Sequence, residues 1–412
     1  MQDSPRYAVG IDIGTTTVRC VVGHLDATTG APTIVGVGEV KNTGMRKGSV
    51  VNLNGPAQAI DEALGEAERM SGYEVNVAAV SINGSHILST TADGMIAVGA
   101  IDHIVGTEDI ARLEEVATVG KVPANREILE VIPHSYRLDG QDNIKDPAGM
   151  TGTRLEINAN VISAMAPQMT GLRSALDMAK VSPSVITPSV VAAARAVLTE
   201  QQLENGVAVI DMGGATTSIA IFEEGDLQFA GVIPIGSNNI TNDLAIGLKT
   251  DPEVAELVKL THGSATRQTG SDTVTVKQDK DSLEFSRADV DEIIEARLEE
   301  LFEAIVKELK KAGRHAKLPS GIVLTGGGAK LKNIVDYTKE SLGLAARVGS
   351  AGGFSGVAEH LDEPQFAAAV GLMLIDAEGT GRQGDLQAGT KTKRAVHQAG
   401  GAMKRLFGRF RP

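Results

Sequence analysis

Two stretches of this chain, Gly10-Ile-Asp-Ile-Gly-Thr-Thr-Thr17 and Val209-Ile-Asp-Met-Gly-Gly-Ala-Thr-Thr217, decide its fold. In each, an apolar run delivers an aspartate, a glycine turn follows, and threonines lead into a second apolar run. Such a turn lets backbone N–H groups approach phosphate oxygens, and the aspartate is placed for a hydrated Mg²⁺. One Asp-x-Gly sequence alone is most often a hairpin turn. Two copies in register predict a duplicated nucleotide clamp.

The residues of the two turns are the first candidate contacts for a nucleotide. The candidate phosphate contacts are Asp12, Gly14, Thr15, Thr16, Asp211, Gly213, Gly214, Ala215 and Thr216, and the candidate Mg²⁺ ligands, acting through water, are Asp12 and Asp211.

A third glycine turn argues against two unrelated hairpins. The stretch from Gly321 to Ile334 reads as a buried strand, a glycine turn and the start of a helix. A turn of this kind lets the backbone lie flat against a base and a ribose. The candidate contacts to the nucleoside are therefore Gly326, Gly327, Gly328 and Lys330.

The order of these three loops resembles that of the actin, chaperone and sugar-kinase superfamily. Within it, the stretch 142–156, DNIKDPAGMTGTRLE, resembles a segment of the FtsA family of bacterial cell-division actin homologues. Further similar segments are 45–49, 80–87 and 131–136, and the resemblance runs from Arg6 to the C-terminus. It implies an α/β, actin-like two-domain fold with duplicated phosphate-binding hairpins, an inserted 1C-type subdomain and a C-terminal amphipathic helix.

The rhythm of apolar residues gives the same layout. Expected strands lie near 7–13, 18–23, 34–38, 77–82, 127–138, 153–163, 272–277 and 282–285, and expected helices over 56–70, 107–119, 168–180, 189–199, 238–247, 251–260 and 287–311, the last capped by Ser286. Residues 84–163 break the α/β rhythm and exceed ordinary loop lengths, which favours an inserted domain over an elaborated loop.

Combined with the resemblance, this layout predicts eight segments. They are 6–83 (first part of subdomain 1A), 84–163 (inserted subdomain 1C), 164–190 (return of 1A), 191–237 (subdomain 2A), 238–300 (subdomain 2B), 301–378 (the rest of 2A with a closing helix), 379–398 (a flexible linker) and 399–412 (an amphipathic membrane-targeting helix).

The segment 255–263, AELVKLTHG, resembles the Ala-Glu-x-x-Lys segment of the superfamily. The resemblance implies that Glu256 binds the ribose hydroxyls and that Lys259 lies beside the adenosine. The residues alone leave an alternative open, because Glu and Lys three positions apart also form solvated pairs on helices.

The helix that precedes the second loop bears on catalysis. In hydrolysing relatives it opens with Gln or Glu, which orients the attacking water, whereas 187–189 here offers only Thr, Pro and Ser. Phosphoryl transfer depends on in-line positioning and charge stabilisation. We expect ATP and Mg²⁺ to bind, with weak or no hydrolysis and no catalytic residue assigned.

Composition narrows the remaining classes. With 412 residues, 42% hydrophobic, 47 glycines and one cysteine, the chain suits a two-domain α/β protein without disulfides. No apolar run of about 18 residues occurs, and residues 1–6 lack an apolar signal stretch. Eight histidines lack metal-ligand spacing. We expect a protein of the cytoplasmic compartment that touches membrane only by lying on it.

The C-terminal end carries the opposite charge from the rest of the chain. Residues 391–412 hold seven bases and no acid, so the rest of the chain, within a total of −13, carries −20. The apolar stripe at i, i+3, i+4 and i+7 is Met403, Leu406, Phe407 and Phe410, and the flanking bases are Lys404, Arg405, Arg409 and Arg411. This pattern predicts reversible binding to an anionic lipid surface, while the acidic body avoids nucleic acid. A helix docked on its own domain is the alternative.

The resemblance implies a function as well. It describes an ATP-binding, filament-forming adaptor that holds the tubulin-like protein FtsZ at the cytoplasmic face of the cell membrane, at the midcell septum, and recruits downstream membrane proteins of the divisome. Two alternatives stay open: a sugar or carboxylate kinase of the same superfamily, and an actin-like scaffold of a pilus or secretion machine.

Overall fold

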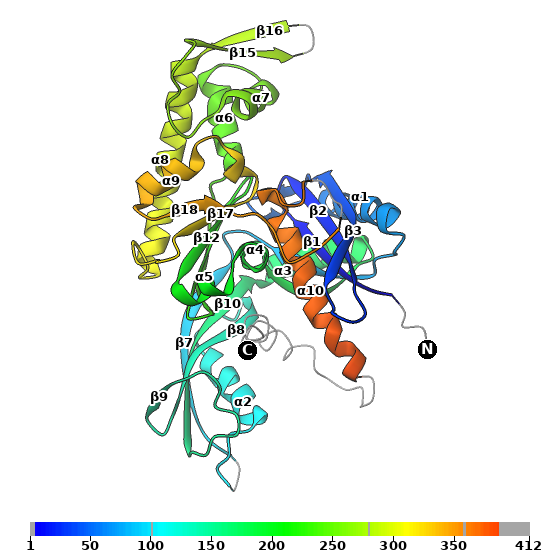
Figure 1. The fold of residues 1–412 in the computed structure, drawn as a ribbon, viewed down its shortest axis with the longest axis vertical. Coiled ribbons are helices and arrows are strands. Elements are labelled where there is room, and N and C mark those ends of the chain that lie inside the picture. Colours follow the sequence, from blue (N-terminus) through cyan, green and yellow to red (C-terminus); the bar gives the residue numbers. More distant parts are fainter. Residues whose placement is uncertain (1–4, 100–101, 279–280, 357–359, 387–412) are drawn as a thin grey trace.

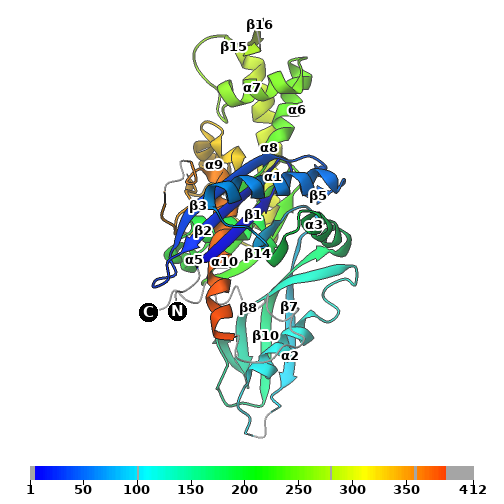
Figure 2. The same ribbon diagram turned by 90° about the vertical axis from the view of Figure 1, so that its right-hand side faces the viewer.

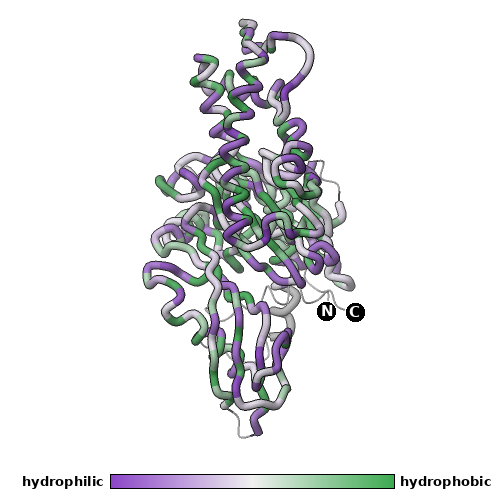
Figure 3. The backbone as a smooth tube through the Cα atoms, turned by 90° about the vertical axis from the view of Figure 1, so that its left-hand side faces the viewer, coloured by the Kyte–Doolittle hydropathy of each residue, from purple (hydrophilic) through white to green (hydrophobic). Residues whose placement is uncertain are grey.

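A computed structural model describes residues 5–99, 102–278, 281–356 and 360–386. Two α/β halves lie side by side, and a smaller sheet extends from one end of the pair (Figures 1 and 2). Many of the apolar segments lie in the middle of the molecule (Figure 3).

The first half is built on a five-stranded sheet in the order β11-β6-β1-β2-β3. Its strands are β1 (Arg6–Ile13), β2 (Thr17–Leu25), β3 (Pro32–Lys41), β6 (Val77–Ile82) and β11 (Ser182–Pro188). β1 and β2 form the first predicted hairpin, antiparallel from Arg6 opposite Leu25 to Ile13 opposite Val18. Two helices, α1 (Asn54–Ser71) and α3 (Ala166–Met178), pack beside this sheet. A short hairpin, β4 (Met45–Arg46) and β5 (Ser49–Val50), lies between β3 and α1.

The second half repeats this plan with the sheet order β14-β13-β12-β17-β18. Its strands are β12 (Val207–Met212), β13 (Thr217–Glu223), β14 (Asp226–Ile233), β17 (Ile322–Thr325) and β18 (Ala346–Val348). β12 and β13 form the second predicted hairpin, from Val207 opposite Phe222 to Met212 opposite Thr217. The apolar runs around both turns therefore pair as the sequence indicates.

Two helices lie between the sheets and join the halves. α4 (Ser189–Val197) contacts β11 and β12, and α10 (Ala367–Leu386) packs against β1 and α4. Glycine permits these close contacts, since a β-carbon at Gly371 would lie 1.7 Å from Ala192 O of α4, and one at Gly10 would lie 2.3 Å from Ala369 O. The buried carboxyl of Asp376 on α10 accepts hydrogen bonds from Val9 N at 2.9 Å and from Ser184 Oγ at 2.6 Å.

The inserted subdomain is a four-stranded antiparallel sheet in the order β7-β10-β8-β9 with one helix on a face. Its elements are β7 (Leu88–Ala97), α2 (Thr107–Thr118), β8 (Arg126–Leu138), β9 (Gln141–Ile144) and β10 (Arg154–Met165). Leu113 and Leu155 are fully buried in a hydrophobic cluster of its own. The segment is a domain with its own core and not an elaborated loop.

A second insertion extends from the other end of the molecule (Figure 1). It contains α6 (Ser237–Gly247), α7 (Pro252–His262), the hairpin β15 (Thr273–Gln278) and β16 (Asp281–Ser286), and the first part of α8 (Arg287–Lys311). Ser286 Oγ accepts a hydrogen bond from Asp289 N at 3.3 Å, which confirms the predicted cap. The predicted boundary at residue 300 falls inside α8.

The expected strands and helices are all present, with ends shifted by a few residues. Sequence reading missed the strands β4, β5, β7, β9, β11, β14 and β18 and the helix α5 (Glu200–Asn205). The helix start expected at Ile334 is the first residue of α9 (Ile334–Leu342). Two short 3₁₀ helices, η1 (Gly327–Lys330) and η2 (Pro364–Phe366), also went unpredicted.

One predicted boundary is wrong. The flexible linker was expected from residue 379, but α10 continues to Leu386. Its first turns are buried against β1 and α4, and once a helix is nucleated each added residue gains a hydrogen bond, so propagation extends beyond the apolar part. The remainder of the predicted linker and the amphipathic helix 399–412 lie outside the described residues. Within the described ranges no helix has the length and apolar character needed to cross a membrane.

Candidate functional site

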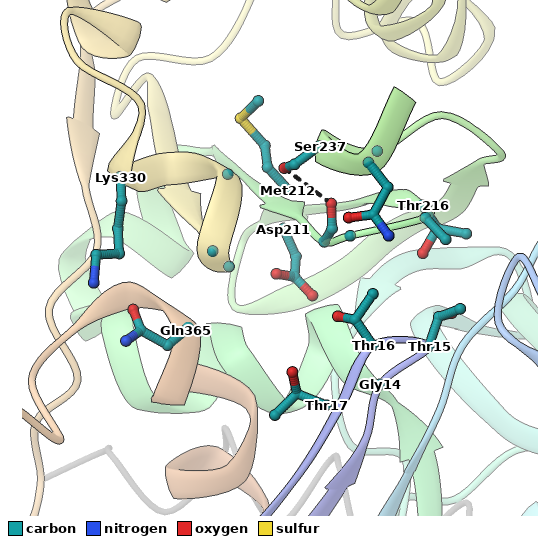
Figure 4. Close-up of a pocket in the computed structure, with 18 of the residues that line it drawn as sticks. Gly14, Thr15, Thr16, Thr17, Asp211, Met212, Thr216, Ser237, Lys330 and Gln365 are labelled. Atoms are coloured by element: carbon teal, nitrogen blue, oxygen red, sulfur yellow. Dashed lines mark hydrogen bonds between the residues drawn. The ribbon is translucent and has the colours of Figure 1, made fainter. Parts of the chain in front are cut away.

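A cleft of about 710 Å³ opens between the two halves. Its walls come from the turns after β1 and β12, from α6 and α7, and from the turn after β17 (Figure 4). Every nucleotide contact predicted from the sequence lines it: Asp12, Gly14, Thr15, Thr16, Asp211, Gly213, Gly214, Ala215, Thr216, Glu256, Lys259, Gly326, Gly327, Gly328 and Lys330. Segments separated by more than 300 positions are thus brought to one place.

The first turn, which we call loop 1 (residues 14–17), is closed by a hydrogen bond from Gly14 N to Thr17 O at 3.0 Å. Two neighbours of the same half support it. Asn42 donates from Nδ2 to Gly14 O at 2.7 Å, and Gly48 N donates to Thr15 Oγ1 at 3.0 Å. Loop 1 is therefore held by the segment between β3 and α1.

The second turn, loop 2 (residues 213–216), is closed by the equivalent bond, from Gly213 N to Thr216 O at 2.9 Å. Its support is the N-terminus of α6. Ser237 N donates to Gly213 O at 2.9 Å and Asn238 N donates to Gly214 O at 2.7 Å, while Ser237 Oγ also reaches Gly213 O at 3.2 Å (Figure 4). These amides position loop 2 by satisfying its carbonyl groups.

Two glycines of the cleft are required by space. A β-carbon at Gly214 would lie 2.7 Å from Thr16 Cγ2, so the two loops approach each other too closely for a side chain there. Gly326 has φ +79°, and a β-carbon on it would lie 2.4 Å from Asp211 Oδ1. Glycine alone fits both the backbone angle and the space at Gly326.

The geometry of the loops fits phosphate groups. No hydrogen bond among the described residues uses the backbone N–H of Thr15, Thr16, Gly214 or Ala215. Successive N–H groups in a tight turn form an anion-binding concavity. Both loops therefore present donors to the cleft from opposite sides.

Two carboxyl groups lie beneath the loops. Asp12 accepts a hydrogen bond from Ser81 Oγ at 2.8 Å, and Asp211 accepts one from Ser189 Oγ at 3.4 Å. Burial raises the pKa of Asp12, against the effects of Ser81 and of Arg19. Burial and then the charge of Asp12 raise the pKa of Asp211 to about 7. Because the two carboxyl groups are desolvated and carry like charge, ionising both of them is unfavourable unless a cation lies nearby.

The same pair fits Mg²⁺. Within the residues described, no group of three or more histidines, cysteines, aspartates or glutamates could hold a metal ion by itself. Mg²⁺ keeps several waters and is commonly held by one or two carboxylates together with substrate phosphates. Asp12 and Asp211 are suited to hold it in this way, and the bound ion would supply positive charge to the phosphates.

Glu256 and Lys259 of α7 form an ion pair with each other, as the alternative to nucleotide contact allowed. Lys259 Nζ lies 2.7 Å from Glu256 Oε2 and donates to Thr241 Oγ1 at 2.8 Å. The Lys259 side chain is only 9% exposed, against 40% for Glu256. The pair is therefore not a fully solvated one, because Lys259 is nearly buried, and both residues line the cleft. Their contacts with ribose and adenosine stay predictions.

The third loop is joined to the start of α10. Gly326 N donates to Pro364 O at 2.9 Å, and Lys330 Nζ lies 2.6 Å from Glu363 Oε2. Hydrogen bonds from Lys330 and then from Gln365 lower the pKa of Glu363 to about 2. Figure 4 shows Lys330 and Gln365 on the same side of the cleft. The glycine turn is thereby fixed between β17 and η2.

The helix before loop 2 agrees with the sequence. α4 begins at Ser189, whose hydroxyl bonds Asp211 and lines the cleft, and Thr187 is buried before it. The position that the resemblance assigns to a water-orienting Gln or Glu is therefore occupied by the short hydroxyl of Ser189.

Sequence reading missed the residues that support the loops and several that line the cleft. The supports are Asn42, Gly48 and Ser81, and the further lining residues include Arg19, Glu39, Asn83, Ser189, Ser237, Asn238, Arg297, Lys332 and Gln365. The segment Gly236-Ser237-Asn238 carried a usable signal, because it opens a predicted helix directly after the hairpin. Asn42 and Gly48 carried none, since nothing local indicates which loop they reach.

Two family models match the chain. One, described as "Cell division protein FtsA", matches residues 208–371, and one described as "SHS2 domain inserted in FTSA" matches residues 84–163. The second covers the inserted subdomain.

Several proteins resemble the chain over most of its length. Cell division protein FtsA of Pseudomonas aeruginosa is 33% identical over 375 residues, which is 90% of this chain and 89% of that protein. FtsA of Bacillus subtilis is 35% identical over 91% of this chain and 84% of its own length. FtsA of Escherichia coli is 29% identical over 97% and 96%.

Solved structures agree on the fold. The PilM-PilN type IV pilus biogenesis complex gives a TM-score of 0.66 at 18% identity over 90% of this chain and 98% of that one, and MreB5 of Spiroplasma citri bound to ADP gives 0.57 at 13% over 92% and 99%. At these identities the likeness shows the fold alone. The expected actin-like α/β fold with an inserted domain is confirmed, and with the identities to the FtsA proteins it shows that the chain belongs to the FtsA family of cell-division proteins.

Proposed function

We propose that this actin-like cell-division protein binds ATP with Mg²⁺, polymerises, and tethers FtsZ to the cytoplasmic face of the membrane at midcell. The observation that carries the proposal is the cleft, where three loops distant in sequence meet in a chain of the FtsA family. The sequence of the C-terminal tail and the family resemblance supply the remainder.

In the proposed complex, loops 1 and 2 hold the phosphates through backbone N–H groups. Asp12 and Asp211 hold Mg²⁺ through its waters, and Glu256 and the 326–328 turn contact ribose and base. Because Ser189 replaces a water-orienting amide or carboxyl, hydrolysis is slow, and the nucleotide serves mainly to stabilise the closed, polymerising form.

The proposed membrane contact is the segment 399–412, whose bases and apolar stripe lie at the end of an acidic chain. Four apolar side chains contribute at most roughly 1.5–3 kcal/mol each when buried, and each base contributes about 1 kcal/mol near an anionic surface. Ordering the segment subtracts from this. A single molecule therefore binds weakly, and a filament gains avidity by carrying many tails.

The proposed partners are FtsZ, further copies of this chain and the downstream membrane proteins of the divisome. We propose the same subdomain layout as the sequence predicts, with FtsZ docking on 2B (residues 238–300) and neighbours or later components contacting 1C (84–163). Nucleic acid has no proposed role.

Liposome flotation tests the tether. FtsZ, ATP and anionic vesicles are mixed with the full chain or with the double variant Phe407→Glu/Phe410→Glu. We expect FtsZ in the lipid fraction only with the intact tail. The matched control is Gln387→Glu/Gln398→Glu, which adds the same two negative charges within the predicted linker and leaves the apolar stripe intact. This control should still float FtsZ.

Two other functions make different predictions. A sugar or carboxylate kinase would bind ATP yet leave FtsZ unfloated with every variant, and it would consume ATP when an acceptor is added. An actin-like pilus or secretion scaffold would reach the lipid without FtsZ. The identity to FtsA proteins, against the fold-level likeness to a pilus protein, favours the division function.

A further inference from the structure

We propose that the inserted subdomain is a brace between the two halves, and that its contacts with strand β14 limit opening of the cleft and set the rate at which nucleotide leaves. By its place in the chain the subdomain belongs to the first half, since it lies between β6 and α3. Yet β7, β8 and β10 all contact β14, the edge strand of the second sheet. Figure 2 shows β14 at the upper end of these strands.

Lys145 is the centre of the polar contact. It follows β9, and its Nζ lies 2.8 Å from Oδ2 of Asp226, the first residue of β14, and 3.4 Å from Oε2 of Glu224 in the β13–β14 turn. The same Nζ donates to His134 O at 3.1 Å, within the inserted sheet. One ammonium group therefore binds a carbonyl of the insertion and two carboxylates of the second half.

A second hydrogen bond crosses the same boundary. His134 Nε2 donates to Leu227 O at 3.1 Å, a carbonyl of β14 itself. Burial acts to lower the pKa of Lys145, but Asp226 and Glu224 outweigh it and the pKa is raised. The Lys145 side chain is one-third exposed and that of Asp226 is 18% exposed, so the ion pair is only partly screened by water.

Apolar packing continues the contact towards the first half. Leu129 and Ile132 of β8 and Leu227 and Ala230 of β14 are all buried and belong to one hydrophobic cluster with the core of the first sheet. The insertion is thus wedged between both halves, and it covers an edge strand that would otherwise present unpaired backbone groups.

The position of this contact has a mechanical consequence for the cleft. The inserted subdomain and the second insertion extend from opposite ends of the molecule (Figure 1). The cleft is lined by loops 1 and 2 and by α6 and α7 of the second insertion, and the described residues that line it include none of the inserted sheet. A ligand that contacts loops of both halves enters and leaves by rotation of one half against the other. Any such rotation separates β14 from the first half, so it must break the Lys145 and His134 contacts or move the insertion as well.

The first experiment measures release of a fluorescent ATP analogue by stopped flow, and it rests on the proposed nucleotide site. Lys145→Met should raise the dissociation rate by roughly three- to tenfold, as expected when coupling between two parts is weakened. The matched control is Arg137→Met, because Arg137 pairs with Asp142 and Glu156 inside the inserted sheet and does not reach β14. The control should release the analogue at the wild-type rate.

Exchanging the charges of Lys145 and Asp226 tests whether their electrostatic attraction slows release. Lys145→Glu should release the analogue faster than Lys145→Met, because it faces Asp226 and Glu224 with a like charge. Adding Asp226→Lys should bring the rate back towards that of the wild type. Failure of the second change to slow release, with unchanged melting temperatures, would overturn the proposal.

The second experiment needs no nucleotide. Spin labels on Asp61→Cys in α1 and Glu299→Cys in α8 report the distance between the halves, and the single natural cysteine, Cys20, is buried. The brace predicts a broader distance distribution in Lys145→Met and an unchanged one in Arg137→Met. Identical distributions in all three proteins would show that the brace does not exist. A broader distribution without analogue binding in any protein would instead refute the proposed nucleotide site and leave the brace standing.

Discussion

Loops 1 and 2 close with the same backbone bond, yet they differ at the next residue and in what supports them. Loop 1 places Thr15 there, and its hydroxyl accepts from Gly48 N. Loop 2 places Gly214 there, because Thr16 of the opposite loop occupies the space for a side chain. Both loops keep the same turn, but the residue after the first glycine differs because its surroundings differ. The two loops are therefore supported differently. A side-chain hydrogen bond to Thr15 positions loop 1, whereas the close approach of Thr16 to the Gly214 backbone positions loop 2.

The largest effect should come from giving loop 2 the residue of loop 1. Gly214→Thr places a β-carbon 2.7 Å from Thr16 Cγ2, so the loops must separate. Overpacking typically costs about 1–3 kcal/mol, and we expect the dissociation constant for MgATP to rise by roughly a hundredfold. Titration calorimetry measures it. Gly65→Ala, with open space around its β-carbon, is the control for glycine replacement; wild-type affinity in Gly214→Thr would contradict the asymmetry.

The two carboxyl groups provide the next comparison. Asp211 keeps its proton up to about pH 7 in the folded protein, against an ordinary pKa of 3.8. The folded state then binds more protons than the unfolded state between these values, so the free energy of unfolding falls as pH rises from about 4 to 7. Without nucleotide or Mg²⁺, Asp211→Asn should remove this slope and raise stability at pH 7 by roughly 2 kcal/mol, about 2 °C in melting temperature.

The matched variant Asp12→Asn should gain less stability, because the hydrogen bond from Ser81 at 2.8 Å favours the charged form of Asp12. Melting curves from pH 4 to 8 compare the two. Equal gains would show that the carboxyl groups are equivalent.

A smaller effect is expected from the support of loop 1. Thr15→Val removes the acceptor of Gly48 N and should cost about 1 kcal/mol, which is roughly a fivefold loss of MgATP affinity. Thr15→Ser keeps the hydroxyl and should stay close to the wild type. A loss with Thr15→Ser as large as that with Thr15→Val would mean that the methyl group and not the hydrogen bond positions loop 1.

The smallest effect should be at the support of loop 2. Ser237→Ala removes the hydroxyl bond to Gly213 O at 3.2 Å but keeps the backbone bond from Ser237 N to the same oxygen at 2.9 Å. Since that carbonyl stays paired, we expect at most about a twofold loss of affinity. A tenfold loss in the same titration would show that loop 2, too, depends on a side chain.

The sequence predicted the hairpins because their information is local: apolar runs, one aspartate and a glycine turn. For the same reason, and with help from the resemblance, the residues predicted to bind the nucleotide all line the cleft. The sequence did not predict Asn42, Ser81 or the Lys145–Asp226 pair, whose partners lie 28, 69 and 81 positions away. These long-range polar pairs depend on how the sheets and insertions pack together, and no local sequence pattern predicts that packing. The predicted end of α10 was wrong because residues 379–386 have the composition of a linker. Composition does not show how far a helix continues once its first turns are buried.

The hydrogen bonds of the Asp376 carboxyl determine how a mechanical force applied to α10 reaches the rest of the molecule. Through this carboxyl α10 grips β1 at Val9, three positions before Asp12, and β11 at Ser184. Tension applied to the C-terminal end of α10 is carried along β1 as shear, in which neighbouring hydrogen bonds share the load, and it arrives at the root of loop 1. A pull on α10 thus reaches both walls of the cleft, loop 1 through Val9 and the third loop through the hydrogen bond from Gly326 N to Pro364 O just before α10.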